Sequence, residues 1–184
     1  MNLTGQLIIA MPDMGDPRFE RAVILICAHS ASGAMGLILN QPVPELRFRD
    51  LLAQLKIPRG DQARDIHMLI GGPVERGRGF VLHSTDYHGG SATMAVGSGY
   101  GMTTTLDVLE ALGHGRGPLQ AILAFGYSGW GAGQLEAEIA RNDWLIGDAS
   151  DGLVFGPEAS RKWALALGSM GINPMALSPS GGRA

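Results

Sequence analysis

The side chains best suited to acid–base or metal chemistry gather in residues 83–88. His83, Asp86 and His88 lie within this stretch, and Ser84 stands beside His83. Histidine and carboxylate side chains can transfer protons in a reaction or ligate a metal ion. The sequence contains no His-Glu-x-x-His pattern and no pair of cysteines to complete such a site. We therefore interpret the histidines as hydrogen-bonded or solvated side chains beside a turn, and we predict neither a metal site nor a cofactor.

A second unusual segment is Gly126-Tyr127-Ser128-Gly129-Trp130-Gly131-Ala132-Gly133-Gln134-Leu135-Glu136. A strand is predicted before it and a helix after it, so backbone N–H groups at the helix start could bind phosphate or carboxylate. The glycines do not follow the G-x-G-x-x-G spacing, and no P-loop motif occurs in the chain. Ser128 does not form a nucleophile elbow, because Trp130 replaces the second glycine and no histidine follows. A tight structural turn and an anion-binding turn both remain open.

The segment 71–79 is also rich in glycine. It begins with Gly71 and Gly72 and carries Arg76 and Arg78. A guanidinium group can hold phosphate or carboxylate through two parallel hydrogen bonds. We predict a long connection between two strands here, which is either a solvated loop or a second anion-binding loop.

The charge balance is not typical of a protein that binds nucleic acid mainly through the phosphates. The 184 residues include 14 Lys and Arg against 17 Asp and Glu, and the net charge is −3. Phosphate-driven binding requires a basic surface, and the sequence shows no convincing helix-turn-helix. We therefore predict no direct contact with nucleic acid.

The cysteine content and the apolar runs indicate the compartment. The single cysteine, Cys27, lies in the apolar run 22–28, which predicts a buried and unreactive thiol. The chain opens without a basic and apolar leader, and its apolar runs are too short to cross a bilayer as helices. We expect a soluble cytoplasmic protein without a membrane segment.

Apolar periodicity places the elements that must position these groups. Strands are predicted at 6–10, 22–28, 34–40, 66–70, 80–83, 92–96, 120–125 and 153–155, and helices at 48–55, 104–112, 135–144 and 158–167. Thr104 and Asp107 resemble a capping pair at the second helix. No repeat or linker divides the chain, and the helices do not alternate regularly with the strands. The sequence predicts one domain of mixed α+β type.

Several separated blocks together resemble one family. They are residues 7–12 with 16–19, 33–42, 71–74, 79–84 and 126–136. In this order they are similar to the YqgE/AlgH family of bacterial proteins, and they extend from residue 7 to about residue 155. Ser128 stands where alanine is common in that family.

The resemblance implies a fold and a setting rather than a reaction. It implies a single compact domain over residues 1–177, with a split, strongly curved sheet that forms a barrel-like core and helices packed outside. Residues 178–184 are expected to be a flexible tail. The resemblance also implies a cytosolic bacterial protein, with a role in transcriptional regulation of alginate production proposed for the family. It carries over no catalytic residue.

We predict a non-catalytic binding or regulatory protein that recognises a small anionic ligand or a partner protein. The alternative is an enzyme that acts on a small anionic substrate through His83, Asp86 and the segment 126–134. The polar and glycine-rich segments between apolar strands supply the candidate surface. Its residues are Asn40, Gly71, Gly72, Arg76, Arg78, His83, Ser84, Asp86, Ser128, Trp130, Gly131 and Glu136.

Overall fold

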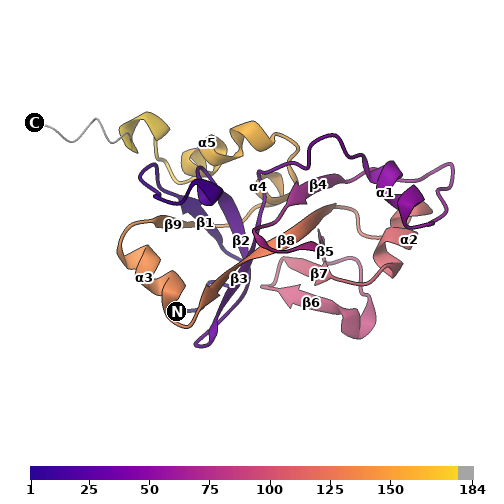
Figure 1. Cartoon of the computed structure of the whole chain (residues 1–184), viewed down its shortest axis with the longest axis horizontal. Helices are drawn as coiled ribbons and strands as arrows, with labels where there is room; N and C mark the ends of the chain where they lie inside the picture. Colours follow the sequence, from indigo (N-terminus) through magenta and orange to yellow (C-terminus); the bar gives the residue numbers. More distant parts are fainter. Residues whose placement is uncertain (178–184) are drawn as a thin grey trace, which may run out of the picture.

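One long strand, β8 (Ala121–Gly131), belongs to both halves of a split, strongly curled sheet. The other strands are β1 (Leu7–Ala10), β2 (Val23–Ser30), β3 (Gly33–Ile38), β4 (His67–Ile70), β5 (Val74–His83), β6 (Thr93–Val96), β7 (Tyr100–Thr103) and β9 (Trp144–Gly147). In the computed structural model, which describes residues 1–177, their order is β6-β7-β5-β8-β3-β2-β1-β9, with β4 parallel to β8. β8 pairs with β4 and most of β5 in its first half and with β3 in its second half (Figure 1).

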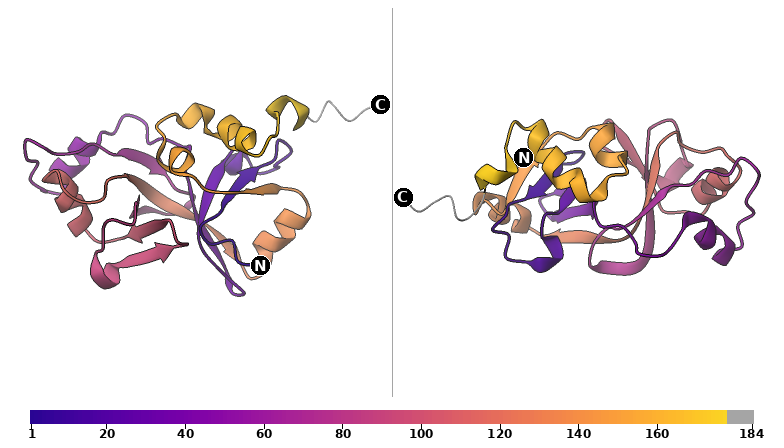
Figure 2. Two further views of the ribbon diagram at one scale, coloured as in Figure 1. Left: turned by 180° about the vertical axis from the view of Figure 1, so that it is seen from behind. Right: turned by 90° about the horizontal axis from the view of Figure 1, so that it is seen from above.

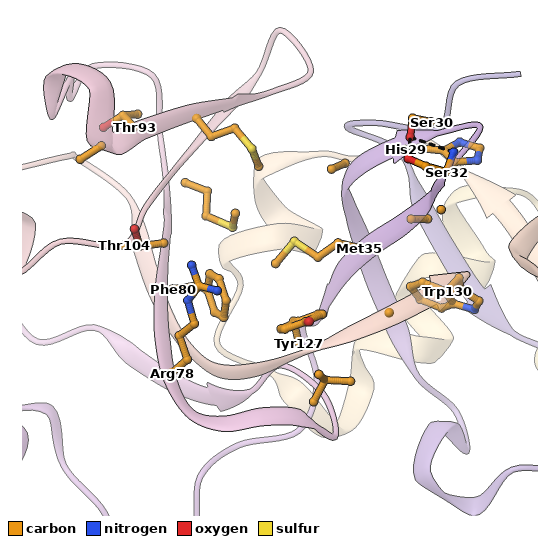
Figure 3. A pocket seen from close by; sticks show the side chains of 18 of the residues that line it. His29, Ser30, Ser32, Met35, Arg78, Phe80, Thr93, Thr104, Tyr127 and Trp130 are labelled. Carbon is orange, nitrogen blue, oxygen red and sulfur yellow. Dashed lines mark hydrogen bonds between the residues drawn. The ribbon is translucent and has the colours of Figure 1, made fainter. Parts of the chain in front are cut away.

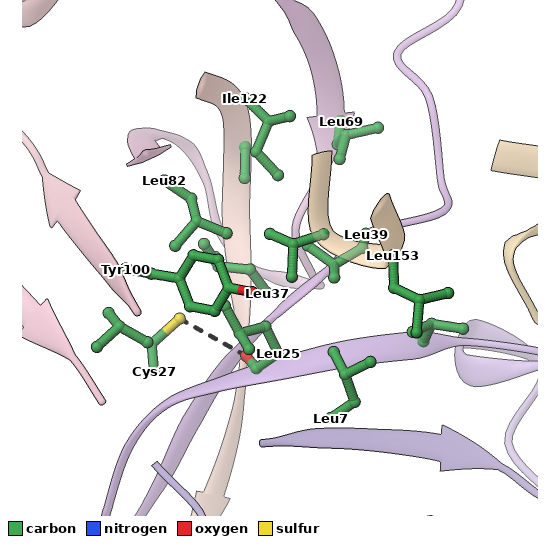
Figure 4. Close-up of a cluster of buried hydrophobic side chains, with 14 of the residues drawn as sticks. Leu7, Leu25, Cys27, Leu37, Leu39, Leu69, Leu82, Tyr100, Ile122 and Leu153 are labelled. Carbon is green, nitrogen blue, oxygen red and sulfur yellow. Dashed lines mark hydrogen bonds between the residues drawn. The ribbon is translucent and has the colours of Figure 1, made fainter. Parts of the chain in front are cut away.

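Strands at the centre of the sheet are apolar on both faces because both faces are covered. Leu7 and Leu25 point to the inside of the half-barrel, whereas their neighbours Ile8 and Ile24 point to the outside. Figure 4 shows the inner cluster, in which side chains from β1, β2 and β3 meet those of β5, β7 and β8. Cys27 lies in this cluster as a buried free thiol, which confirms the prediction for this residue.

Five α-helices of the described residues cover the sheet: α1 (Phe48–Gln54), α2 (Asp107–Gly113), α3 (Gln134–Ala140), α4 (Asp151–Phe155) and α5 (Ala159–Ser169). Helices α1 and α2 pack on the outer face of β4, β5 and β8, and α3 packs on the outer face of β1, β2 and β3. Helices α4 and α5 close one end of the half-barrel, as the views in Figure 2 show. Within the part of the chain that the structure describes, no α-helix lines the opposite end, beside the β2–β3 hairpin. The predicted α+β fold with a barrel-like core and outer helices is therefore confirmed.

The two glycine-rich segments are largely strand, so the loop predicted over 71–79 and the turn predicted over 126–134 are wrong. β5 already begins at Val74, with an irregularity in its pairing before Gly79. β8 continues through Gly131 because its second half is hydrogen-bonded to β3. Helix α3 begins only at Gln134. Pairing with distant strands decides both structures, and local composition does not reveal it.

The strand predicted at 153–155 is the helix α4. Ser150 caps this helix, because its Oγ accepts a hydrogen bond of 3.3 Å from the backbone N–H of Leu153. The helix predicted to reach residue 144 ends at Ala140, and Trp144 instead opens β9, which pairs with β1. Capping and strand pairing thus override the apolar spacing from which these two elements were predicted.

Helix α2 and strand β7 also differ from expectation. Leu106 occupies the N-cap position of α2 without a side-chain hydrogen bond, so the predicted cap of Thr104 and Asp107 does not form. Strand β7 was not predicted, because Tyr100–Thr103 includes a glycine and follows another at position 99. The predicted tail, 178–184, lies outside the described residues. None of the helices within residues 1–177 combines the length and apolar character needed to cross a bilayer.

Candidate functional site

The open end of the half-barrel contains a cleft of about 1090 Å³. Its apolar lining includes Met35 from β3, Phe80 from β5 and Tyr127 from β8, and these side chains point into the same space (Figure 3). Met94 and Met102, from β6 and β7, complete the wall on the other side. Phe80 and Tyr127 contact each other edge to face, with ring centroids 6.0 Å apart. The cleft is thus a preformed apolar surface at the mouth of a barrel, a frequent location for ligand sites.

Arg78 supplies the charge of this cleft. Among the described residues that line it, Arg78 is the only Lys, Arg, Asp or Glu. Its guanidinium carbon lies 5.0 Å from the centroid of the Phe80 ring, so the cation stacks on the aromatic floor (Figure 3). The neighbouring carboxylate of Glu75 lies 3.5 Å away, and both side chains are more than half exposed. Such a long, exposed ion pair contributes little and leaves the guanidinium available to a ligand.

The rim of the cleft consists of hydroxyl groups and one buried histidine. Ser30 and Ser32, at the tip of the β2–β3 hairpin, are hydrogen-bonded to each other at 2.7 Å, and Thr104 lies on the opposite rim. The His29 side chain is only 1% exposed, and both of its ring nitrogens are engaged. Nδ1 accepts a hydrogen bond from Leu3 N, and Nε2 lies 2.6 Å from Glu136 Oε1. His29 therefore supports the wall rather than presenting a ring nitrogen to a ligand.

Most of the sequence-predicted site residues lie outside this cleft. Of the twelve, Arg78 and Trp130 line it. Arg76 is exposed on β5 but does not line the cleft. The indole N–H of Trp130 donates to Glu138 Oε2 at 2.9 Å, and the same oxygen accepts from Trp144 at 2.8 Å. This arrangement anchors Trp130 to α3 and β9.

Gly71, Gly72 and Ser128 form a crossing between two chain segments. A Cβ on Gly72 would lie 2.1 Å from the carbonyl carbon of Tyr127, so only glycine fits there. Ser128 is fully buried, and its Oγ donates to the carbonyl oxygen of Gly71 at 3.2 Å. These residues therefore hold the β4–β5 connection against β8, and the hydroxyl is not exposed as a nucleophile would be. Gly126 adopts a left-handed φ of 71° at the same crossing.

His83, Ser84 and Asp86 form a separate polar cluster. His83 is fully buried, with Nδ1 2.8 Å from the carbonyl oxygen of Ser84 and Nε2 2.8 Å from Thr103 Oγ1. Burial lowers the pKa of His83 below its ordinary value. Asp86 accepts hydrogen bonds from Ser84 Oγ and from Leu119 N, and the Ser84 bond is the main cause of its lowered pKa. Of the two states that the sequence leaves open for His83, solvated or hydrogen-bonded, the structure shows the hydrogen-bonded one.

The remaining candidates also hold backbone in place. Asn40 accepts from Val23 N at 3.0 Å and donates to Arg21 O at 2.8 Å. Gly131 N donates to Gln134 Oε1 at 3.0 Å, at the start of α3. Within residues 1–177, no three His, Cys, Asp or Glu side chains are grouped as metal ligands.

Apart from Trp130, the apolar residues that build the cleft are not among those that the sequence singles out. Met35 and Phe80 lie in predicted strands, where alternation turns one face to the core, whereas Met102 and Tyr127 lie in segments that the local sequence does not predict as strands. Alternation alone does not distinguish the closed part of a half-barrel from its open mouth. The signal that could have found them is the pairing of strands across the split sheet.

Comparison with known proteins agrees with this architecture. The AlgH-like family model (DUF179) matches residues 7–175. A UPF0301 protein of Cereibacter sphaeroides (strain ATCC 17029) is 57% identical over the full length of both chains. A UPF0301 protein of Paracoccus denitrificans is 54% identical over all of this chain and 97% of its own.

Two solved structures share the fold. The solution structure of the AlgH protein from Pseudomonas aeruginosa superposes with a TM-score of 0.78 at 36% identity, over 100% of this chain and 97% of that chain. The crystal structure of protein DIP2367 from Corynebacterium diphtheriae has a TM-score of 0.73 at 22% identity, over 95% of this chain and 89% of that chain, and indicates a common fold alone. Since the family match covers nearly all of the described residues, the resemblance expected from the sequence is confirmed, and the chain belongs to the AlgH-like family.

Proposed function

We propose that this protein is a binding protein whose cleft at the mouth of the half-barrel takes a small organic anion with an apolar body. The observation that carries the proposal is Arg78, which is the one permanently charged side chain among the described residues of the lining and is stacked on the apolar floor at Phe80. The apolar part of the ligand would lie on Met35 and Tyr127, and its anionic group would meet the guanidinium. Arginine binds a carboxylate through two hydrogen bonds, which orients the ligand.

Two features make the cleft suited to recognition. The guanidinium is already held over the Phe80 ring, so less side-chain freedom is lost when a ligand binds. Met35, Met94 and Met102 line the apolar part, and unbranched methionine side chains adapt to ligands of different shape. These properties favour binding of a class of related anions over a single rigid ligand.

The same lining offers little for acid–base catalysis. Both ring nitrogens of His29 are engaged, with Leu3 and Glu136. In the alternative enzyme site, both ring nitrogens of His83 are likewise engaged. These contacts support a binding role over the enzyme hypothesis. A role in transcriptional regulation stays a prediction that rests on the family resemblance, and a cytoplasmic location stays a prediction from the sequence and that resemblance. The net charge of −3 still argues against direct nucleic-acid binding.

The test is a titration of the ¹⁵N-labelled protein with octanoate, followed by NMR chemical shifts. Its uncharged control is 1-octanol, which has the same chain without the carboxylate. We expect octanoate to shift the backbone signals around Met35, Phe80 and Tyr127. In Arg78→Met, which keeps an apolar stem but removes the charge, octanoate affinity should fall by about tenfold or more, since a hydrogen bond to a charged group contributes roughly 1.5–3 kcal/mol.

The matched control is Arg76→Met, because Arg76 lies two residues away on β5 and outside the lining. This variant should bind octanoate as the wild type does, and 1-octanol should bind all three proteins equally. Octanoate shifts elsewhere in the molecule, or equal affinity of wild type and Arg78→Met, would contradict the proposed site.

A further inference from the structure

A second, smaller cavity lies inside the half-barrel near the end that α4 and α5 close, and a buried lysine lines it. Lys162 on α5 is 3% exposed, and its Nζ donates to the carbonyl oxygen of Val154 at 3.4 Å. The cavity measures about 50 Å³, and its other walls are mainly apolar, with Leu39, Met68 and Ile122 among them. Lysine is rarely buried this completely without a partner.

Among residues 1–177, no carboxylate accompanies this ammonium group as a counterion. No Asp or Glu among residues 1–177 forms an ion pair with Lys162. The cavity lining contains no carboxylate, and His67 is its one other titratable residue. An ammonium has three N–H donors, whereas the protein offers Lys162 a single, long hydrogen bond.

The surroundings disfavour the charge without removing it at neutral pH. Burial alone lowers the pKa of Lys162 to about 8. At pH 7 most of the molecules therefore still hold an ammonium ion in an apolar cavity. A buried charge of this kind is stabilised by a partner of opposite sign.

We propose that this cavity binds a small monovalent anion as the counterion of Lys162. The anion accepts the N–H groups that the Val154 carbonyl leaves unused, and Leu39, Met68 and Ile122 shield the pair from water. A water molecule needs roughly 10–15 Å³ by this measure, so the cavity accepts an ion of about three or four non-hydrogen atoms or fewer. Chloride, formate and nitrate fit this limit, whereas a bulky carboxylate such as gluconate does not.

The composition of the chain provides an internal control. It contains two lysines, and the other one, Lys56, is exposed. Selective ¹³C labelling of lysine therefore gives one resonance for the site and one for the control. The pH titration of each is followed by NMR in sodium gluconate, and then at the same ionic strength with chloride, formate or nitrate.

We expect each small anion to move the titration midpoint of Lys162 to higher pH and to leave Lys56 unchanged. An anion at ten times its dissociation constant raises the midpoint by about one pH unit, because it binds the ammonium form alone. The same anions should raise the melting temperature of the wild type and of Lys56→Met, but not of Lys162→Met. An unchanged Lys162 midpoint in 200 mM of each anion, or an equal shift of both lysines, would overturn the proposal.

Discussion

His29 Nε2, in strand β2, lies 2.6 Å from Glu136 Oε1, in helix α3, and donates a hydrogen bond to it. The direction follows from the other ring nitrogen, because Nδ1 accepts from the backbone N–H of Leu3 at 3.0 Å. A backbone N–H can only donate, so Nδ1 carries no proton and the neutral ring must carry it on Nε2. One side chain thus ties the N-terminal segment and α3 to the wall of the cleft.

This geometry predicts the tautomers of three histidines. His29 should be protonated on Nε2, whereas His83 and His114 should be protonated on Nδ1, because there Nδ1 faces a backbone carbonyl oxygen. Two-bond ¹H–¹⁵N correlation spectra at pH 8 distinguish the two tautomers directly. A His29 spectrum of the Nδ1–H type would show that the bond to Leu3 does not exist in solution.

The same bond predicts the effect of substituting Glu136. Glu136→Ala leaves the Nε2–H of a buried ring without an acceptor, so the melting temperature should fall. Glu136→Gln retains a side-chain oxygen at the same position, and its melting temperature should fall less. Equal losses in the two variants would mean that packing of α3, rather than the hydrogen bond, explains the effect.

The buried His83 predicts a dependence of stability on pH. Its Nε2 accepts from Thr103 Oγ1, which in turn accepts from Thr93 Oγ1 at 2.7 Å. Burial lowers the pKa of His83, so the unfolded chain binds the proton more readily than the folded one. The contribution of His83 to stability should therefore be complete above about pH 6.5 and should be lost as the pH falls towards the lowered pKa.

Thr103→Val tests this network, because it removes the hydroxyl group and keeps the shape. Urea unfolding at pH 7 should show a loss of about 1–3 kcal/mol, the typical effect of leaving a buried polar group without its partner. Thr104→Val, at an exposed neighbouring position, should change the stability by less than about 0.5 kcal/mol. Equal stability of the two variants would argue against the hydrogen bond to His83.

The sequence predicts the strands and helices of this fold better than it predicts which strands pair with each other. The apolar run at 22–28 predicts a strand buried on both faces, and the structure confirms it, because covering both faces leaves a continuous apolar pattern. The segment 126–131 is also strand, but its glycines resemble a turn when they are considered locally. Only its pairing with β3, almost a hundred residues earlier in the chain, makes it extended.

In the candidate site, too, some residues can be predicted from the local sequence and others depend on how distant strands pair. Arg78 could be selected from the sequence, because an arginine in a polar, glycine-rich segment is a plausible anion ligand. Met35 could not, since an inward-facing apolar residue at the open mouth of a half-barrel has the same local pattern as one in its core. Tyr127 could not, since its glycine-rich segment resembles a turn. The sequence predicts a solvated or anion-binding loop at Gly72, whereas in the structure glycine is required there because two backbones cross.

Gly71 and Gly72 cross β8 closely, so we expect alanine to lower the stability of the protein at position 72 but not at position 77. In Gly72→Ala the new Cβ would lie 2.2 Å from the Tyr127 carbonyl oxygen, so one of the two segments must move. We expect a loss of about 3 kcal/mol, comparable with overpacking a rigid core. Gly77→Ala is the matched control, because a Cβ there has no neighbour within 4 Å. Chemical denaturation that finds the two variants equally stable would contradict the close approach.

Because Lys162 is buried, we expect the free energy of unfolding to depend on pH. Its pKa falls from an ordinary value of 10.5 to about 8 in the folded protein, a shift that corresponds to about 3 kcal/mol. The unfolded chain binds the additional proton between these two values, so the folded state gains stability as the pH rises from about 8 to about 10.5. Below pH 8 the full penalty of the buried charge applies.

Lys162→Met removes that penalty at nearly constant volume. In gluconate buffer at pH 7 the variant should be more stable than the wild type by up to about 3 kcal/mol, and the difference should shrink as the pH approaches 10.5. Cys27 and Tyr100 also titrate differently in the folded protein, because burial raises each pKa to about 12. Both residues are present in wild type and variant, so their contributions cancel in the difference. A difference that stays constant from pH 7 to pH 10 would mean that Lys162 binds its proton equally well in the folded and in the unfolded chain, so that burial does not lower its pKa.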